Sequence, residues 1–371
     1  MAKLGDYVSI KASSKKLVGD DFWLLNLDMV EQQTGRVIEY NRVSADKLDG
    51  SIIQFDTDCV LYSKLRPNLN KVVLPQIDGY ATSEMLPLRP DTSVLSREYL
   101  AEYLRSEHFV TWAISKTAGA KMPRLGSKEL LSKELHIPTL EEQAHIVALF
   151  QRIAELIDTK KQELELLDEL VESRFIEMFG NCENEVLIGD VISISRGASP
   201  RPISAFITDG DDGVNWIKIG DVSENSLYIT KTEEKITPEG AKKSRMVYKG
   251  DFILSNSMSF GRPYILGING CVHDGWLIMS NFKDTFNELY LYHAIRSDDV
   301  QYQFSGKVNG ATVKNLNSDL VKNTFIKVPS MELQEQFAAF VEQTDKSKLA
   351  VQNSIAELEE LKKSLMQKYF G

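Results

Sequence analysis

A direct internal repeat constrains this chain more than any other feature of its sequence. When the sequence is aligned with itself at an offset of 191 residues, residues 99–180 match residues 290–371 without a gap, with 19 identities in 82 positions. The identical pairs include Tyr99/Tyr290, Arg105/Arg296, Gly119/Gly310, Pro138/Pro329 and Phe179/Phe370. Shared Leu and Glu content in two helices does not explain glycine and tyrosine pairs. The sequence therefore predicts a duplicated fold with two copies of one plan.

Each copy of the repeat ends in a segment with the signature of a long helix. In the first copy Thr139 follows a proline and can cap a helix, Glu142 stands three residues later, and neither Pro nor Gly occurs again before Gly180. Apolar residues recur at three- and four-residue spacing in both copies. At a rise of 1.5 Å per residue, a helix of this kind is roughly 60 Å long.

An isolated helix cannot bury such an apolar stripe, so we expect the two helices to pack together and any remaining stripe to face a partner protein. The alternative is an intramolecular coiled coil with no partner. The stripe residues expected at these contacts are Ile146, Phe150, Ile153, Ile157 and Leu164 in the first helix, and Phe337, Val341, Val351 and Ile355 in the second.

The repeat also predicts how the chain is divided. We expect a first globular domain at residues 1–138, a first long helix at 139–180, a second globular domain at 181–329 and a second long helix at 330–371. Each globular part has short strand patterns punctuated by Gly and Pro, with one closing helix at about 96–116 and 285–304. The expected fold class is α+β: two similar mixed α/β domains separated by two long antiparallel helices, with pseudo-two-fold symmetry.

The charge distribution leaves a polyanionic partner open although the chain carries a net charge of −10. The two helical segments hold most of this charge, −6 in 139–180 and −2 in 330–371, whereas 1–138 is neutral and 181–329 carries −2. Binding of a polyanion depends on local patches of positive charge and not on the net charge of the chain.

Several classes of protein are excluded at this stage. The three cysteines form no Cys-x-x-Cys pair and the five histidines have no metal-ligand spacing, which excludes disulfide scaffolds and zinc modules. No run of 18 apolar residues and no secretory signal occurs, so a cytoplasmic protein without a membrane segment is expected.

The sequence carries no motif for catalysis. A phosphate-binding loop, a dinucleotide-binding turn, a zinc-protease motif, a nucleophile elbow and an Asn-Pro-Pro-Tyr signature are all missing. Asp221 with Glu233-Glu234-Lys235 fits a nuclease-like pattern, but such a charge run in a loop is usually a solvated face.

Two polar loops at equivalent places in the halves, residues 62–71 and 255–264, instead combine cations, amides and hydroxyls. Arg and Lys can contact guanine, Asn can contact adenine, and hydroxyl groups bind phosphate oxygens. Further cations follow the repeated Gly-Ala pair and lie near residues 196–218. The candidate DNA-binding residues are Lys64, Arg66, Asn68, Asn70, Lys71, Lys121, Arg124, Arg196, Arg201, Lys218, Ser257, Ser259, Arg262, Lys314 and Asn315. Trp216 and Trp276 are more typical of a core than of a stacking platform.

Together these features resemble the specificity subunit of type I restriction-modification systems, over essentially the entire chain. The motifs that carry the resemblance are Leu-Tyr-Ser-Lys-Leu-Arg-Pro-Asn-Leu-Asn-Lys (61–71), Gly-Ala-Thr-Val-Lys-Asn-Leu (310–316), the proline-initiated helices and the Phe-Gly pairs that end them. The second helix departs slightly, with Glu-Leu-Gln-Glu-Gln at 332–336.

The resemblance implies a non-catalytic DNA reader. Two target-recognition domains would each read one half of a bipartite asymmetric sequence in double-stranded DNA. The helices would pack antiparallel as a spacer and bind two modification subunits that carry S-adenosylmethionine and methylate adenine N6. Restriction/translocase subunits would use ATP and Mg, and this chain itself would hold no cofactor or metal.

Two rival functions stay open from the sequence. One is a scaffold that joins partners through its helices without touching DNA. The other is a nuclease or methyltransferase with an unrecognised site. Because the globular parts are nearly neutral, we also expect the isolated chain to bind DNA weakly.

Overall fold

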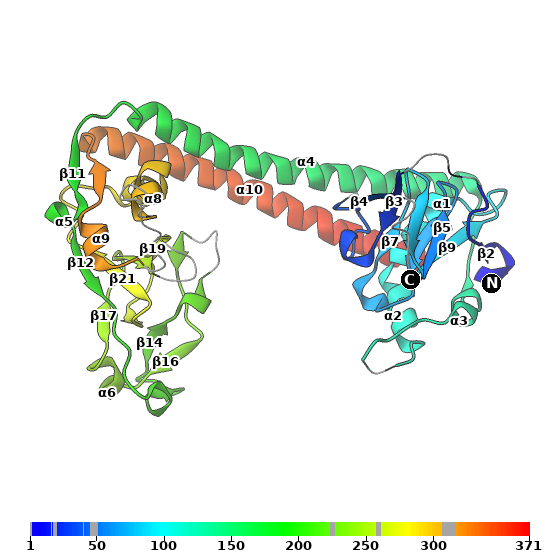
Figure 1. The fold of residues 1–371 in the computed structure, drawn as a ribbon, viewed down its shortest axis with the longest axis horizontal. Coiled ribbons are helices and arrows are strands. Elements are labelled where there is room, and N and C mark those ends of the chain that lie inside the picture. Colours follow the sequence, from blue (N-terminus) through cyan, green and yellow to red (C-terminus); the bar gives the residue numbers. More distant parts are fainter. Residues whose placement is uncertain are drawn as a thin grey trace. The chain divides into compact units, whose positions relative to one another are not determined.

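The computed structural model describes residues 2–15, 17, 21–39, 41–44, 51–119, 121–222, 227–256, 261–305 and 316–371. The chain forms two compact units (Figure 1). Unit 1 comprises Met1–Gln162 with Gln352–Gly371, and unit 2 comprises Glu163–Val351. The boundaries fall inside the two long helices, so each of these helices contributes one end to each unit.

The two long helices are confirmed. Helix α4 spans Leu140–Phe179 and helix α10 spans Met331–Phe370, so their bounds differ by the offset of the sequence repeat. The expected capping box starts α4: the Glu142 backbone N–H donates to Thr139 Oγ1 at 3.3 Å, and the Thr139 N–H donates to Glu142 Oε2 at 2.9 Å. These bonds satisfy backbone donors that the first turn of a helix leaves unpaired.

The described residues of unit 1 form two four-stranded sheets and a short strand pair. The first sheet has the order β2-β9-β6-β7, the second has the order β4-β3-β8-β5, and β1 pairs with β10. The strands are β1 (Ala2–Lys3), β2 (Val8–Ile10), β3 (Asp21–Leu25), β4 (Asn41–Ser44), β5 (Ile52–Phe55), β6 (Val60–Ser63), β7 (Val72–Val73), β8 (Gly79–Thr82), β9 (Met85–Pro90) and β10 (Glu134–Leu135). Its shorter α-helices are α1 (Arg97–Arg105), α2 (Glu107–Ser115) and α3 (Ser127–Leu131).

Unit 2 repeats this plan, and its described residues form two more strands than those of unit 1. Its sheets have the orders β12-β21-β18-β19-β15 and β13-β16-β14-β20-β17, and β11 pairs with β22. The strands are β11 (Glu185–Leu187), β12 (Ser193–Arg196), β13 (Ile207–Thr208), β14 (Val214–Ile217), β15 (Tyr228–Ile229), β16 (Glu234–Ile236), β17 (Arg245–Val247), β18 (Phe252–Ser255), β19 (Pro263–Leu266), β20 (Gly270–Val272), β21 (Trp276–Ser280) and β22 (Phe325–Lys327). Its shorter helices are α5 (Ile188–Val191), α6 (Pro238–Ala241), α7 (Glu288–Arg296), α8 (Asp298–Phe304) and α9 (Ser318–Lys322).

The two units share one topology. In unit 1 β3 pairs in parallel with β8, while β4 and β5 flank this pair antiparallel. In unit 2 β14 pairs in parallel with β20, while β16 and β17 flank it in the same way. The duplication therefore extends to the parts of the chain where sequence identity between the halves is low.

The closing helix of each half differs from the expectation of one continuous segment. It is broken into α1 and α2 at Ser106, and into α7 and α8 at Ser297. Ser106 has extended backbone angles, and its Oγ accepts a hydrogen bond from the Phe109 N–H at 3.2 Å. A serine that caps the next helix ends the previous one, and the apolar periodicity continues through the break.

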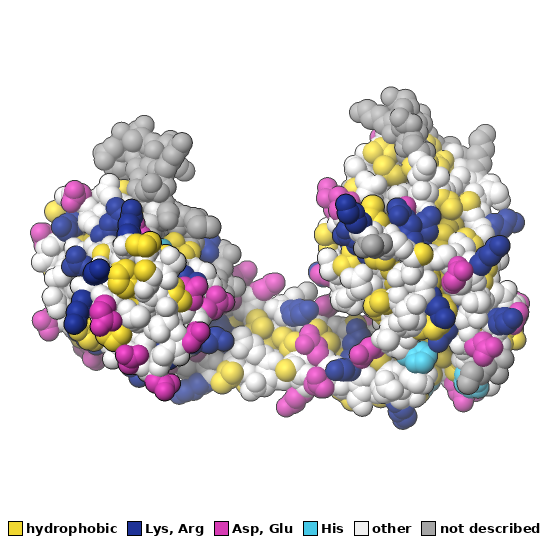
Figure 2. All heavy atoms as spheres, turned by 90° about the horizontal axis from the view of Figure 1, so that it is seen from below, with side chains coloured by type: hydrophobic (Ala, Val, Ile, Leu, Met, Phe, Trp, Pro, Cys, Tyr) yellow, Lys and Arg dark blue, Asp and Glu magenta, His cyan; other side chains and the backbone are white. Residues whose placement is uncertain are grey.

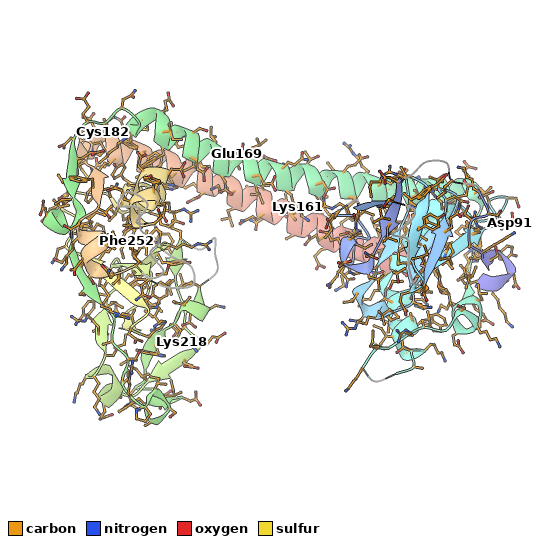
Figure 3. All side chains as sticks on the ribbon, in the orientation of Figure 1. Asp91, Lys161, Glu169, Cys182, Lys218 and Phe252 are labelled. Atoms are coloured by element: carbon orange, nitrogen blue, oxygen red, sulfur yellow. The ribbon has the colours of Figure 1, made fainter. Side chains whose placement is uncertain are left out.

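Each long helix ends on the core of the unit in which the other begins. In unit 1 the Phe370 ring of α10 lies 5.9 Å from Phe150 of α4 and 5.4 Å from Tyr99 of α1. In unit 2 the equivalent Phe179 of α4 lies 5.5 Å from Phe337 of α10 and 4.7 Å from Tyr290 of α7. Within each unit the two helices thus run antiparallel. Phe252, labelled in Figure 3, is fully buried in the same core of unit 2.

A buried glutamine fastens the first turn of each long helix to its globular domain. Gln143 Oε1 accepts from the Ser96 N–H at 2.8 Å, and its Nε2 donates to the carbonyls of Val94 at 2.7 Å and Pro138 at 2.9 Å. Gln334 makes the equivalent three bonds in unit 2 and is likewise fully buried. The described residues include no helix that is long and apolar enough to cross a membrane.

Candidate nucleic-acid interface

In unit 1 the first candidate loop and the turn after the repeated Gly-Ala pair meet at one junction. The Leu125 N–H donates to the Lys64 carbonyl at 2.9 Å, and the Arg66 N–H donates to the Pro123 carbonyl at 2.8 Å. Arg124 forms a bridge with Leu65 on the same edge. Candidates that are far apart in the sequence thus lie on one surface.

Unit 2 forms the same junction from equivalent residues. The Leu316 N–H donates to the Asn256 carbonyl at 2.9 Å, and Leu316 is the repeat partner of Leu125. The Asn256 N–H in turn donates to the Gly275 carbonyl at 3.1 Å. In unit 1 the Lys64 N–H donates to the backbone carbonyl of Glu84 at 3.0 Å. Each unit therefore brings its loop, its repeat turn and one strand-to-strand turn together.

The loop of unit 1 is held in an uncommon backbone conformation. Arg66 and Asn70 both have φ of 50°, and they flank the 3₁₀ turn Pro67–Leu69. Asparagine adopts this left-handed region more readily than arginine, so Arg66 carries most of the local strain. Arg66 and Asn68 are exposed and Lys64 is half-buried. Strained residues often cluster where a chain binds a ligand.

Two candidates of the same loop turn inward. Asn70 is buried, and its Nδ2 donates to the Arg105 carbonyl at 2.9 Å. The Lys71 Nζ donates to the Leu27 carbonyl, and burial lowers the pKa of Lys71. Both side chains hold the loop against its own unit, so they are poorly placed to contact a nucleic acid directly.

Arg124 is exposed and forms an ion pair that the sequence did not reveal. Its Nε lies 3.1 Å from Glu84 Oε2, and its Nη2 lies 3.0 Å from Glu84 Oε1. These hydrogen bonds lower the pKa of Glu84 and raise that of Arg124. Lys121, three residues earlier in the turn, is also exposed. The carboxylate sets the direction of the guanidinium and offsets its charge.

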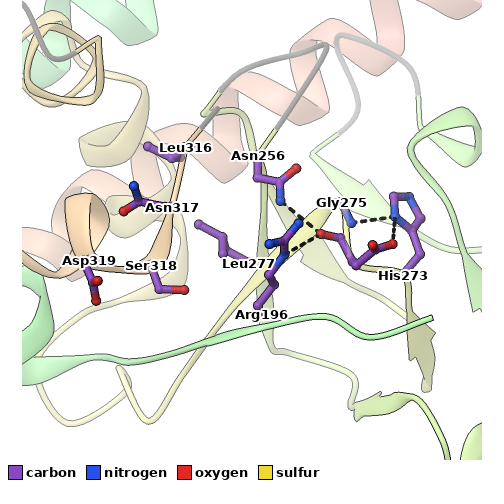
Figure 4. A pocket seen from close by; sticks show the side chains of 10 residues that line it. Arg196, Asn256, His273, Gly275, Leu277, Leu316, Asn317, Ser318 and Asp319 are labelled. Atoms are coloured by element: carbon purple, nitrogen blue, oxygen red, sulfur yellow. Dashed lines mark hydrogen bonds and ion pairs between the residues drawn. The ribbon is translucent and has the colours of Figure 1, made fainter. Parts of the chain in front are cut away.

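In unit 2 Arg196 lines an open hollow of about 610 Å³ (Figure 4). Asn256, Leu316 and Asp274 line the same hollow. Arg196 Nε donates to the Asp274 carbonyl at 2.9 Å, and Asn256 Nδ2 donates to the same oxygen at 3.0 Å. The hollow thus lies directly at the junction of the loop and the repeat turn.

A second open hollow of about 510 Å³ shares Asp274 and His273 with the first. Arg201, Lys218 and Trp216 line it, and Trp216 is otherwise buried in a core cluster. Lys218, labelled in Figure 3, pairs with Glu234 at 2.9 Å, and this hydrogen bond raises the pKa of Lys218.

Arg262, at the far end of the unit 2 loop, is half-buried, and its backbone N–H donates to Ser255 Oγ at 3.1 Å. Four further candidates lie outside the described residues: Ser257, Ser259, Lys314 and Asn315.

The nuclease-like pattern of the sequence has a structural explanation. Asp221 accepts hydrogen bonds from the Lys218 N–H at 2.7 Å and the Glu233 N–H at 3.1 Å, so its carboxylate holds a turn. The described part of the chain contains no group of three or more His, Cys, Asp or Glu side chains that could hold a metal ion. Figure 2 shows basic and acidic side chains interspersed over the coloured surface of the face in view, without a large area of one charge.

The apolar stripe residues of the helices lie on the inner side of each unit. Ile146, Phe150, Ile153, Ile157, Phe337, Val341 and Val351 are buried, and Leu164 and Ile355 are half-buried. This burial agrees with the expected packing of the helices within the chain, and it leaves the buried side chains unavailable to a partner protein. The apolar residues exposed on the long helices are instead Leu140, Leu166, Leu170, Ile176, Leu333, Leu349 and Leu361.

Comparison with known proteins decides the family. The sequence model of the Type I restriction modification DNA specificity domain matches residues 49–169 and 183–362, which is most of the chain. The chain belongs to this family. One matched segment lies in each half of the duplicated chain. The family model describes a DNA specificity domain of type I restriction-modification systems.

Several relatives of known type agree with this family. The specificity subunit of the type I restriction enzyme EcoDI from Escherichia coli is 26% identical over 135 residues, which is 36% of this chain and 30% of that protein. The match thus spans less than a third of the length of this relative. A chain from a type I R-M system, solved to study complex assembly and conformational transition, has a TM-score of 0.70 at 18% identity, covering 100% of this chain and 96% of that one.

Two further structures share the fold. The HsdS subunit from Thermoanaerobacter tengcongensis has a TM-score of 0.50 at 18% identity, covering 100% of this chain and 96% of that one. The type I S subunit from M. genitalium has a TM-score of 0.53 at 12% identity, covering 100% and 95%. At these identities the likeness concerns the fold of the specificity-domain family and not its residues.

Proposed function

We propose that this chain is the non-catalytic DNA-recognition subunit of a type I restriction-modification complex. Residues 1–138 and 181–329 would each read one half of a bipartite asymmetric site in double-stranded DNA. The helices at 139–180 and 330–371 would act as the spacer and as the docking surface for two modification subunits. Restriction/translocase subunits would join the same complex.

The observation that carries this proposal is the duplicated junction. The backbone N–H of Leu125 donates a hydrogen bond to the Lys64 carbonyl in one unit, and that of Leu316 donates to the Asn256 carbonyl in the other. Exposed cations lie beside both junctions. Two copies of one binding surface suit a ligand that offers two half-sites, as a DNA duplex does. Exposed arginines next to a fixed loop can contact both phosphates and base edges.

The docking part of the proposal rests on the outer faces of the helices. Leu166, Leu170 and Ile176 of α4 are exposed, with Leu166 at 62% and Ile176 at 68%. Leu349 of α10, in the same unit, is exposed at 58%. Large exposed apolar side chains on a long helix are typical of a protein–protein contact surface. We therefore place the modification-subunit contact on these residues.

The isolated chain should bind DNA weakly. Arg124 is paired with Glu84 and Lys218 with Glu234, so part of the positive charge is already neutralised within the units. Few free cations release few counterions from DNA, which limits non-specific affinity. Nanomolar sequence-specific binding by the purified chain alone at physiological salt would contradict this expectation.

Mapping of methylated adenines in cells that express this chain with its modification and restriction subunits tests the main proposal. The wild-type complex should methylate one bipartite motif. Arg66→Glu should remove recognition of one half of that motif, because the exposed guanidinium of Arg66 lies on the junction of unit 1. Arg36→Glu, a charge reversal at another exposed arginine of unit 1, should leave the motif unchanged.

Two outcomes would overturn the proposal. If Arg66→Glu and the triple reversal of Lys64, Arg66 and Arg262 both leave the motif intact while the complex assembles, the chain is a scaffold. If the purified chain methylates or cleaves DNA by itself, and one acidic substitution abolishes this activity, the chain is an enzyme. Co-purification of the subunits reports assembly in each case.

A further inference from the structure

An acidic side chain occupies the point where the two hollows of unit 2 meet. Asp274 lies in the turn between β20 and β21, and it lines both the hollow with Arg196 and the hollow with Arg201 and Trp216. The sequence did not identify this carboxylate as a candidate, because cations and amides are the side chains typical of DNA contacts. Its position at the recognition junction requires an explanation, because a carboxylate repels DNA phosphates.

The surrounding residues fix Asp274 in place. Its carbonyl accepts hydrogen bonds from Arg196 Nε and Asn256 Nδ2, two side chains that point toward each other in Figure 4. Its backbone N–H donates to Ser199 Oγ at 3.3 Å, and Ser199 Oγ donates to Asp274 Oδ1 at 2.8 Å. Four contacts therefore orient the turn and one carboxylate oxygen before any ligand arrives, which lowers the entropic cost of using this group in recognition.

The second carboxylate oxygen is held more loosely. Asp274 Oδ2 lies 3.4 Å from Nη2 of Arg201, and the side chains of Asp274 and Arg201 are 43% and 82% exposed. A hydrogen-bond acceptor and a set of fixed-geometry donors thus stand side by side at the surface. A ligand can reach both groups without breaking the contacts that hold the turn.

This arrangement of acceptor and donors matches the major-groove edge of one base pair. Cytosine offers its N4 amino group as a donor, and the guanine paired with it offers O6 and N7 as adjacent acceptors. A carboxylate accepts from cytosine N4, and an arginine can donate to both guanine atoms. Other base pairs do not offer two adjacent acceptors beside a single donor.

Unit 1 also has an acid paired with an arginine in the corresponding turn, although one position further along: the strand registers align Glu84 with Gly275. Glu84 lies in the turn between β8 and β9, which corresponds to the turn of Asp274, and it is paired with Arg124 through three hydrogen bonds. An acid–arginine pair thus lies in this turn in each unit, although the paired residues are not equivalent in the repeat. The closer pair in unit 1 and the looser pair in unit 2 give the two units different surfaces.

We propose that Asp274 determines the specificity of unit 2 by accepting a hydrogen bond from cytosine N4, while Arg201 contacts the guanine of the same C·G pair. This inference rests on the proposed function of the chain as a DNA reader. It assigns one base pair of one half-site to two named side chains.

Selection of bound duplexes from a random-sequence DNA library by the full chain with its modification subunits tests this assignment. In the wild-type complex one position of one half-site should be C·G. Asp274→Ala should reduce the preference at that single position by about tenfold or more and leave the other half-site unchanged. Arg201→Ala should weaken the same position. Asp284→Ala, which removes an exposed acid from the same unit, should leave the motif intact.

The thermal unfolding midpoint shows whether Asp274→Ala is folded. We expect it to fold, because the substitution keeps the hydrogen bonds of Arg196 and Asn256 to the backbone carbonyl of residue 274. If Asp274→Ala is unfolded, Asp274→Asn replaces it, because the amide has the same size and lacks the charge. It should weaken the same single position.

Three results would overturn the assignment: an unchanged motif in the Asp274 variant, an equal loss at all positions, or a loss at an A·T pair. A wild-type complex that selects no motif would instead refute the function proposed for the chain.

Discussion

Replacement of Gln143 by leucine tests whether the buried glutamine fastens helix α4 to the first globular domain. The Gln143 side chain is fully buried and bonds to the Ser96 N–H and to the carbonyls of Val94 and Pro138. Leucine has a similar volume, so it leaves little cavity. It removes all three hydrogen bonds and leaves one donor and two acceptors without this partner.

The expected loss follows from these three groups. A buried polar group that loses its partner costs about 1–3 kcal/mol, and carbonyl groups near a helix start recover part of this through local shifts. We therefore expect Gln143→Leu to lower the free energy of unfolding of unit 1 by about 3 kcal/mol. Because Gln334 makes the equivalent bonds, Gln334→Leu should have a similar effect on unit 2.

Native-state hydrogen exchange of the full chain separates the two units, since it reports the opening free energy of each amide. Amides of α1 should lose protection in Gln143→Leu, and those of α7 should lose it in Gln334→Leu. Gln151→Leu makes the same substitution at an exposed position of α4 and should change stability by less than about 0.5 kcal/mol. The reasoning is refuted if Gln143→Leu and Gln151→Leu have the same effect.

Three further predictions concern a pH dependence, a strained loop and a helix end. Burial lowers the pKa of His293 to about 4, so the unfolded state binds more protons than the folded state between about pH 6.5 and pH 4. The free energy of unfolding should therefore fall as the pH falls through this window. In urea titrations at pH 7 and pH 5, His293→Phe should reduce this pH dependence. Arg66→Gly should relieve the left-handed backbone and raise the unfolding free energy by about 1 kcal/mol while weakening DNA binding, whereas Arg66→Ala should weaken binding without this gain. Phe370→Ala should destabilise unit 1 by about 3–5 kcal/mol, which hydrogen exchange of the α1 amides can measure. Equal protection of these amides in variant and wild type would contradict the packing of Phe370 against Tyr99.

The long helices were predictable because their evidence is local and repeated. A capping Thr-x-x-Glu, the absence of Pro and Gly and a long apolar stripe all point to the same element. The break at Ser106 was not predictable in this way, since a serine that ends one helix and caps the next interrupts neither composition nor periodicity. The shared topology of the units was indicated by the repeat at their ends and by the equivalent polar loops at 62–71 and 255–264.

The residue types in the sequence predicted where the candidate surface lies, but they did not predict the role of each single residue in it. Asn70 and Lys71 have suitable chemistry for DNA, yet their partners Arg105 and Leu27 turn them inward. Asp274 and Glu84 lie on the surface through tertiary contacts that no short motif records. The stripe residues of the helices were identified as contacts, but the helices and the globular cores bury most of them within the chain.

The packing of Phe370 in unit 1 has a consequence for synthesis of the chain. Tyr99 and Tyr103 leave the ribosome long before the residues of α10 that cover them, so the first domain is incomplete while the second is being translated. Unit 2 needs nothing beyond Val351 and can close first. The nascent first domain therefore carries uncovered aromatic surface during this interval, and a chaperone that recognises such surface would be expected to bind there.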